Sequence, residues 1–115
     1  MDDKLALRVS QAGMRFIAQM TIYNSGDFER LRQFVDESYA DVALAEQPVD
    51  ARIAEFRQRY ETLGKLRIQQ VIGTGKHHVL VLLHAQNDDE LYLNELKVDE
   101  EYPHPIVEYR HNLMV

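Results

Sequence analysis

The sequence contains no cysteine, which excludes disulfide bonds, thiol chemistry and zinc sites with cysteine ligands. Long hydrophobic runs are absent too: the longest uninterrupted aliphatic stretch, residues 79–83, is far too short to cross a bilayer. Positive charge is scarce, because 13 lysines and arginines face 19 acidic residues and leave a formal net charge of −6. Nucleic-acid binding requires clustered positive charge, so we expect neither a nucleic-acid nor a membrane partner.

The start of the chain, Asp2-Asp3-Lys4, shows neither the basic nor the apolar segment of a secretion signal. The lack of cysteine suits a reducing compartment, and together these features favour a cytoplasmic location. A length of 115 residues suits one domain that buries about two-thirds of its unfolded surface. No repeat, linker or low-complexity tract divides the chain, so we expect a single domain over residues 1–115.

Three helices are predicted in the first half of the chain. The first covers residues 3–24, where apolar or small residues recur at spacings of three and four; they are Leu5, Val9, Ala12, Gly13, Phe16, Met20 and Tyr23. Gly26 ends this helix by adopting the left-handed conformation cheaply, and Asp27 caps the second helix, residues 27–38. Pro48 fits the first turn of the third helix, which Gly64 ends. Residues 40–47 are ambiguous, with a short helical turn as one interpretation.

The third helix carries a run of charged side chains that is predicted to form its solvated face; these are Arg52, Glu55, Arg57, Arg59 and Glu61. Gly13 weakens the first helix by up to about 1 kcal/mol relative to alanine. A close neighbour is one explanation for a glycine at that position.

After Gly64 the apolar pattern changes to the alternation typical of strands. Four strands are predicted, over residues 66–72, 79–86, 91–98 and 106–113, with a hairpin turn at residues 73–76. One face of the first strand is predicted to hold Leu66, Ile68, Gln70 and Ile72. The alternation slips within the third strand, and a β-bulge near Asn94 and Glu95 would bring its apolar residues to one face; these are Leu91, Leu93, Leu96 and Val98.

This order of elements predicts an α+β fold in which three N-terminal helices pack on a curved four-stranded antiparallel sheet. The second strand is apolar on both faces, so it needs two covers. We expect the helices to supply one cover and a second copy of the chain the other, which gives a homodimer through the sheet face.

The chain resembles the nuclear transport factor 2-like superfamily from about residue 17 to residue 109. Three segments carry the resemblance: Tyr23-Asn24-Ser25-Gly26-Asp27, the predicted helix at residues 48–63, and the sheet that ends with Val98-Asp99 and Pro103-His104-Pro105-Ile106. More narrowly, it is similar to small bacterial domains found alone or fused in front of serine hydrolases and tail-specific peptidases. The resemblance implies a cone-shaped α+β barrel with a cavity between helices and sheet. It implies no particular reaction, because the superfamily includes isomerases, cyclases, dehydratases, transport factors and binding domains.

We predict a binding or accessory domain for a small apolar ligand or a protein, without catalytic activity, cofactor or metal. No base–acid pair stands out at the inward positions of the strands. Histidines 77 and 78 are adjacent, so they point to opposite sides of a strand and do not share a metal readily. The cavity is predicted to be lined by Phe16, Met20, Tyr23, Phe56 and Tyr60, for which ordinary core packing is the simpler interpretation.

Two alternatives remain open at this point. The first is an isomerase or cyclase that uses His84 or Glu95 as base and a tyrosine as donor. His84 shares an apolar strand face with Leu80 and Leu82, and Glu95 lies at the predicted bulge. The simpler interpretations are a histidine satisfied by a neighbour and a glutamate on the solvated face. The second alternative is a protein-interaction module that acts through the outer sheet face around residues 79–86.

Overall fold

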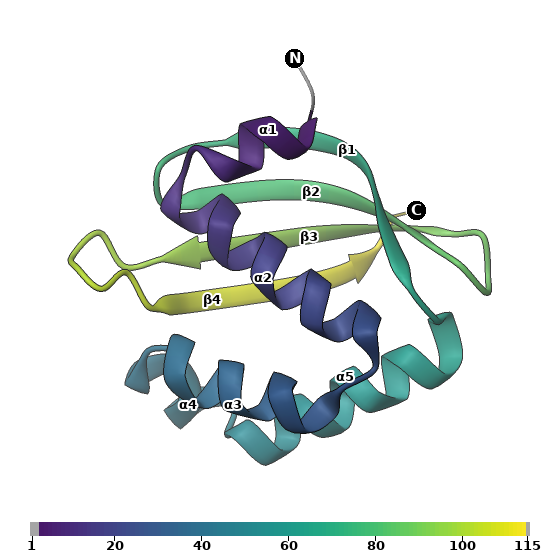
Figure 1. Cartoon of the computed structure of the whole chain (residues 1–115), viewed down its shortest axis with the longest axis horizontal. Coiled ribbons are helices and arrows are strands. Elements are labelled where there is room, and N and C mark those ends of the chain that lie inside the picture. The colour runs from purple at the N-terminus through teal and green to yellow at the C-terminus, as the bar shows by residue number, and fades with distance from the viewer. Residues whose placement is uncertain (1–2, 115) are drawn as a thin grey trace.

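A computed structural model describes residues 3–114, with side chains from residue 5 onward. Within these residues five helices precede an antiparallel sheet of strand order β1-β2-β3-β4 (Figure 1). The helices are α1 (Asp3–Arg8), α2 (Gln11–Ser25), α3 (Phe28–Ser38), α4 (Asp41–Glu46) and α5 (Val49–Leu63). The strands are β1 (Leu66–Thr74), β2 (His78–Ala85), β3 (Leu91–Val98) and β4 (Ile106–Leu113). The α+β class and the four-stranded antiparallel sheet are confirmed.

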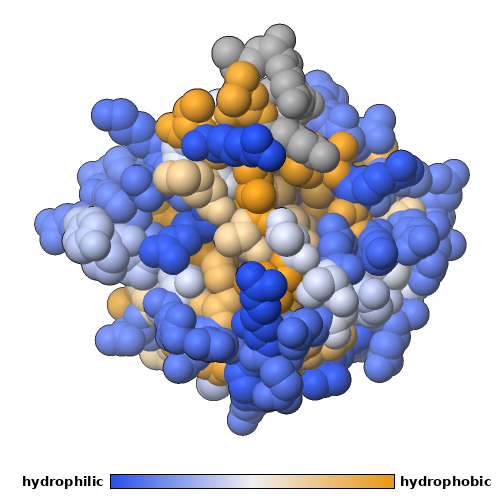
Figure 2. Space-filling model, in the orientation of Figure 1, coloured by the Kyte–Doolittle hydropathy of each residue, from blue (hydrophilic) through white to orange (hydrophobic). Residues whose placement is uncertain are grey.

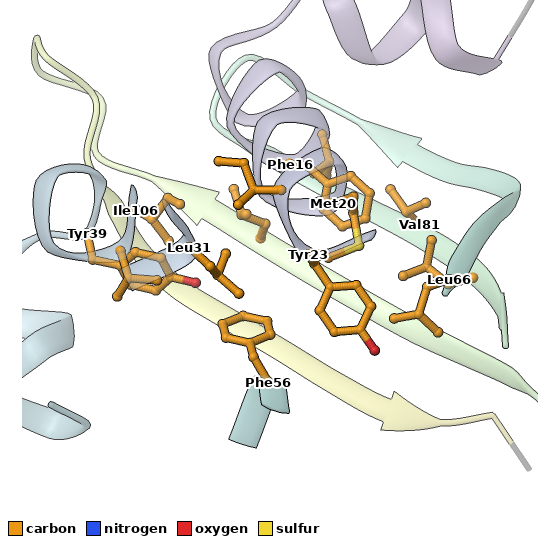
Figure 3. Packing of buried hydrophobic residues seen from close by; sticks show 14 of the residues in the cluster. Phe16, Met20, Tyr23, Leu31, Tyr39, Phe56, Leu66, Val81 and Ile106 are labelled. Carbon is orange, nitrogen blue, oxygen red and sulfur yellow. The ribbon is translucent and has the colours of Figure 1, made fainter. Parts of the chain in front are cut away.

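Helix α2 crosses one face of the sheet, while α3, α4 and α5 lie beyond the β4 edge (Figure 1). This face, which α2 covers, is called the inner face below, and the opposite one the outer face. The core lies between α2, α3, α5 and the inner face, and Figure 3 shows its aromatic and aliphatic side chains meeting there. Apolar surface on the helix side gathers over α1 and the start of α2 (Figure 2), where the exposed hydrophobic side chains are Leu5, Val9 and Met14.

The prediction of one continuous helix over residues 3–24 is wrong. The chain breaks between α1 and α2, where the Ser10 side chain caps α2 by accepting a hydrogen bond from the Gly13 amide at 2.9 Å. Gly13 lies directly against the backbone of α1, because a Cβ at this position would be 1.9 Å from the Leu7 carbonyl oxygen. The glycine therefore permits the close approach of the two helices, and the close neighbour that was offered as its explanation is the Leu7 backbone.

The corner between α2 and α3 has the predicted form. Gly26 ends α2 with a left-handed φ of 77°, and the Asp27 side chain accepts a hydrogen bond from the Arg30 amide at 3.1 Å. The Asn24 side chain pairs with the backbone N–H and carbonyl of Leu66, both at 2.9 Å, and so ties the corner to β1. The ambiguous segment forms α4. With the break after α1, this makes five helices where three were predicted.

The inner and outer faces follow the alternation of each strand. In β2 the inner residues Val79, Val81 and Leu83 are completely buried. The outer face has an apolar centre of half-buried or buried leucines: Leu80 and Leu82 of β2 with Leu91 and Leu93 of β3. Helices cover one side of β2 as expected, and the other side faces away from them.

Two predictions about strand faces are wrong. Strand β3 pairs with β2 residue for residue, so the bulge predicted near Asn94 is absent. Leu91 and Leu93 therefore lie on the outer face, and Leu96 and Val98 lie on the inner face. Register shifts occur instead in β1, between Ile68 and Gln70 and between Val71 and Gly73, and in the pairing of β3 with β4, between Lys97 and Val98. The shifts in β1 move Gln70 to the outer face, and Ile72 is 47% exposed.

Candidate functional site

The five residues predicted to line a cavity lie in the core. Phe16, Met20, Tyr23 and Phe56 are at most 5% exposed, and Tyr60 is half-buried. The Tyr23 ring packs against Phe56 (Figure 3) with a centroid separation of 6.1 Å. It also packs against Tyr60, with a centroid separation of 5.5 Å. Met20 lines a hollow between α2 and β1, whereas Phe56 lines a cavity between α5 and β4. These side chains therefore pack against one another in the core, and the two hollows lie at the edges of that core.

His84 and Glu95, the residues named for the enzymatic alternative, both lie on the outer face. In the register of β2 and β3, Glu95 is opposite Leu80, and His84 is opposite Leu91. Glu95 bonds to His78 at 2.6 Å, and His84 bonds to Asp89 in the turn after β2. Because β3 is regular here, nothing turns Glu95 toward the helices. The sheet separates both side chains from the cavity between α5 and β4.

A cavity of about 90 Å³ lies between α5 and the C-terminal half of β4. Helix α5 contributes residues spaced by three and four, which share one helical face, and β4 contributes two alternate residues of the inner face. The lining consists of Gln47, Arg52, Glu55, Phe56, Arg59, Tyr109 and His111. Phe56 alone among these belongs to the predicted set, and the lining is polar rather than apolar.

A chain of hydrogen bonds connects β3, β4 and α5 at this cavity. Arg59 Nη1 donates to the Tyr109 hydroxyl at 3.3 Å, and this hydroxyl donates to Oδ1 of the completely buried Asn94. The Asn94 Nδ2 faces His111 Nδ1 at 3.0 Å. An amide nitrogen only donates, so Nδ1 of His111 accepts and a neutral ring carries its proton on Nε2. The network thus fixes the tautomer of His111.

His111 Nε2 is buried and has no hydrogen-bond partner within the described residues. Burial lowers the pKa of His111 to about 3, and the positive charge of Arg59 acts in the same direction. The ring is therefore neutral near pH 7. Tyr92 stacks on it with a centroid separation of 4.8 Å and holds its plane. Buried donors in native proteins nearly always have partners, and within the described residues only this nitrogen and Gln19 Nε2 lack one. Of these two residues, His111 lines the cavity.

The two arginines of the cavity have only neutral partners. Arg52 is 8% exposed; its Nε and Nη2 donate to the carbonyls of Gln47 and Ala43, both at 2.8 Å, and its guanidinium lies over the Tyr39 ring. Arg59 lies over the Phe56 ring. In the part of the chain that the structure describes, neither arginine is within 4.0 Å of a carboxylate oxygen. The cavity is therefore a positively charged site in an acidic chain.

A second polar interaction lies behind Arg52. The Tyr39 hydroxyl donates to Gln19 Oε1 at 2.6 Å, and both side chains are almost completely buried. Burial raises the pKa of Tyr39, so its hydroxyl keeps its proton near pH 7. The bond from Tyr39 to Gln19 links α2 to the segment between α3 and α4. This segment contains the Tyr39 ring, over which the Arg52 guanidinium lies.

Sequence reasoning missed most of this site. The prediction that Arg52 belongs to a solvated face is wrong, because α4 covers that side of α5 and Arg52 is buried. The run of charged residues in α5 does not reveal this cover. The signal that was available is in β4, where Tyr109 and His111 alternate with exposed or charged residues and so share a face. Asn94 was assigned to a bulge, whereas its regular strand position directs it into the core.

Comparisons with protein-family models, with curated proteins and with solved structures found no match for this chain. Among the described residues, no helix is long and apolar enough to cross a membrane. Within the same residues, no group of three histidine, aspartate or glutamate side chains is placed to hold a metal ion.

Proposed function

We propose that this chain is a small-molecule-binding domain without catalytic activity of its own, and that the cavity between α5 and β4 is its binding site. The observation that carries the proposal is the buried, unpartnered Nε2–H of His111 in the lining of that cavity. Leaving such a donor unpaired costs about 1–3 kcal/mol. A molecule that accepts this hydrogen bond recovers that free energy on binding.

The same geometry favours binding over proton-transfer catalysis. The basic nitrogen of His111, Nδ1, is occupied by the Asn94 amide, and burial raises the pKa of Tyr109. Glu55 is the acidic residue of the lining, and it is exposed to solvent. A general base needs a pKa near the operating pH and a free lone pair in the site. Neither Tyr109 nor His111 meets both conditions, so an isomerase or cyclase mechanism has less support than binding.

The nuclear transport factor 2-like cone is part of the same proposal. Its support is the long α2 across the sheet, the Asn24-to-Asp27 corner that ties α2 to β1, and the placement of α3, α4 and α5 beyond β4. In such a cone, a cavity between helices and inner face is where a ligand would be bound. A homodimer through the outer face accompanies it, since that face has a leucine centre flanked by charges of both signs, as a self-complementary interface requires.

Fragment screening by protein-observed NMR tests the proposed site. A set of neutral, cationic and anionic fragments is added to ¹⁵N-labelled protein, and backbone amide shifts are mapped. We expect saturable shifts of residues in the segments 52–59 and 109–111, which are lost in His111→Phe. The matched control, His84→Phe, removes a histidine from the outer face and leaves these shifts intact. Fragments that perturb only other regions, or none, contradict the proposal.

A further inference from the structure

We propose that the cavity between α5 and β4 takes a small carboxylate, whose oxygens receive hydrogen bonds from the Nε2–H of His111 and the guanidinium of Arg59. This inference rests on the binding function proposed above and assigns the chemistry of the ligand. It replaces the apolar ligand that was expected from the sequence.

The lining offers more donors than free acceptors, and its free acceptors are the carboxylate of Glu55 and the side-chain oxygen of Gln47. Arg52 and Arg59 carry donors only, and the neutral His111 has its one acceptor nitrogen occupied by Asn94. The Asn94 oxygen in turn already receives the hydroxyl of Tyr109. The carboxylate of Glu55 is the formal negative charge of the lining, and its side chain is exposed. A ligand that presents acceptor oxygens therefore finds more partners here than a donor ligand does.

The positive charges of Arg52 and Arg59 favour an anionic ligand, independently of the hydrogen-bonding groups. Arg52 is almost completely buried and is neutralised only by two backbone carbonyls and the face of the Tyr39 ring. A buried cation without an anionic partner is unfavourable, and a bound anion removes that deficit. Arg59 is restrained by the Phe56 ring and by its bond to the Tyr109 hydroxyl, and a guanidinium is a planar fork that suits a planar, two-oxygen acceptor.

The size of the cavity suits a small carboxylate. A cavity of about 150 Å³ accepts benzene, which has six non-hydrogen atoms. The cavity described here has about 90 Å³, which by the same proportion holds roughly three or four non-hydrogen atoms. A carboxylate with a short tail has that number. A longer tail reaches the adjoining hollow of about 280 Å³, which shares Gln47, Arg52 and Tyr109 with the cavity.

The experiment compares ligands of nearly equal shape. Acetate, acetamide, inorganic phosphate and chloride are titrated into the uniformly ¹⁵N-labelled chain of 115 residues at constant pH and ionic strength. The readouts are the side-chain nitrogen shifts of His111 and the backbone shifts of α5 and β4. We expect acetate to shift His111 Nε2 saturably and to bind at least tenfold more tightly than acetamide, whose amide group brings donors toward the arginines. Phosphate and chloride should leave His111 unchanged.

Two arginines on α5 provide a matched pair of variants. Arg59 lies over Phe56 and lines the cavity, whereas Arg57 lies over Phe28 and does not line it. Arg59→Met should weaken acetate binding at least tenfold, and Arg57→Met should leave it unchanged. Both variants remove one positive charge from the same helix, so a general electrostatic effect would appear equally in both. Backbone spectra confirm that each variant is folded.

The outcomes separate this inference from the proposed function. Acetamide binding as tightly as acetate, or phosphate binding more tightly, overturns the carboxylate assignment and leaves a small-molecule site in place. Equal acetate binding by Arg59→Met and Arg57→Met also overturns it, because it would show that acetate responds to the overall charge of α5 and not to a specific contact with Arg59. If no fragment or anion perturbs the cavity, water satisfies His111, and both the assignment and the proposed function fail.

Discussion

The Asn94 amide of β3 donates to Nδ1 of His111 in β4 at 3.0 Å, and this single bond determines which ring nitrogen keeps the proton. Asn94 also accepts the hydroxyl of Tyr109, so one completely buried amide orients both polar side chains that β4 contributes to the cavity. The site is thus prepared by the sheet before any ligand arrives.

Replacing Asn94 with leucine should destabilise the protein by about 2–4 kcal/mol, because it leaves the Tyr109 hydroxyl and His111 Nδ1 buried without their partner. Urea denaturation of both proteins measures the difference. Gln58→Leu is the control: Gln58 is exposed on α5, away from the outer face, and its substitution should change stability by no more than about 0.5 kcal/mol. Equal effects of the two substitutions would refute the buried network.

Stability should fall as the pH is lowered from about 6.5 toward 3. Burial lowers the pKa of His111 to about 3 in the folded protein, while the unfolded chain takes up the proton near pH 6.5. Above pH 6.5 both states are neutral and the contribution is complete. Between the two values each pH unit removes up to about 1.4 kcal/mol.

The variant His111→Phe isolates this effect from the other titrating groups. Unfolding free energies of both proteins are measured between pH 7.5 and pH 5, and the slope of the wild type should be steeper. Parallel curves would mean that His111 is accessible to protons in the folded state.

Gly13→Ala should destabilise the protein by about 1–3 kcal/mol, as overpacking does. In an ordinary helix interior the same change stabilises by up to about 1 kcal/mol, so the sign of the effect is the test. The reason is the Leu7 carbonyl, which would lie 1.9 Å from the new Cβ. Chemical denaturation measures it, with Gly73→Ala as control, where the new Cβ would make an ordinary 3.9 Å contact with Leu80. A stabilised Gly13→Ala variant would show that α1 does not pack there.

Leu93→Lys should convert the proposed homodimer to a monomer, since it places a charge in the leucine centre of the outer face. Sedimentation equilibrium over a range of protein concentrations gives the mass directly. Val42→Lys, at an exposed position of α4, is the control and should leave self-association unchanged. A wild-type protein that stays monomeric at the highest concentration would exclude the dimer.

Local chemistry explains which features could be predicted from the sequence. Gly26 and Asp27 specify their corner by backbone preference alone, and the last two strands have the predicted bounds because their ends are marked by turn residues. The break between α1 and α2 could not be predicted in this way. It depends on the contact between Gly13 and Leu7, and Ser10 also fits a helix interior without that contact.

The site was harder to predict for the same reason. Arg52 is buried because α4 and the Tyr39 ring cover it, and no periodicity within α5 reports that cover. Asn94 was interpreted through a bulge that the regular pairing of β3 with β2 rules out. The polar cavity combines residues from α5, β3 and β4, so its composition follows from tertiary packing rather than from any one segment.

The side-chain nitrogen spectrum of His111 decides whether its Nε2–H binds an acceptor within the cavity, as we propose. Two-bond ¹H–¹⁵N spectra at pH 7 assign the tautomer, first in the free protein and then with acetate. We expect a neutral ring with its proton on Nε2, and a saturable shift of that nitrogen as acetate is added. A proton on Nδ1, a charged ring, or an Nε2 resonance that does not respond to any added ligand would contradict the proposal.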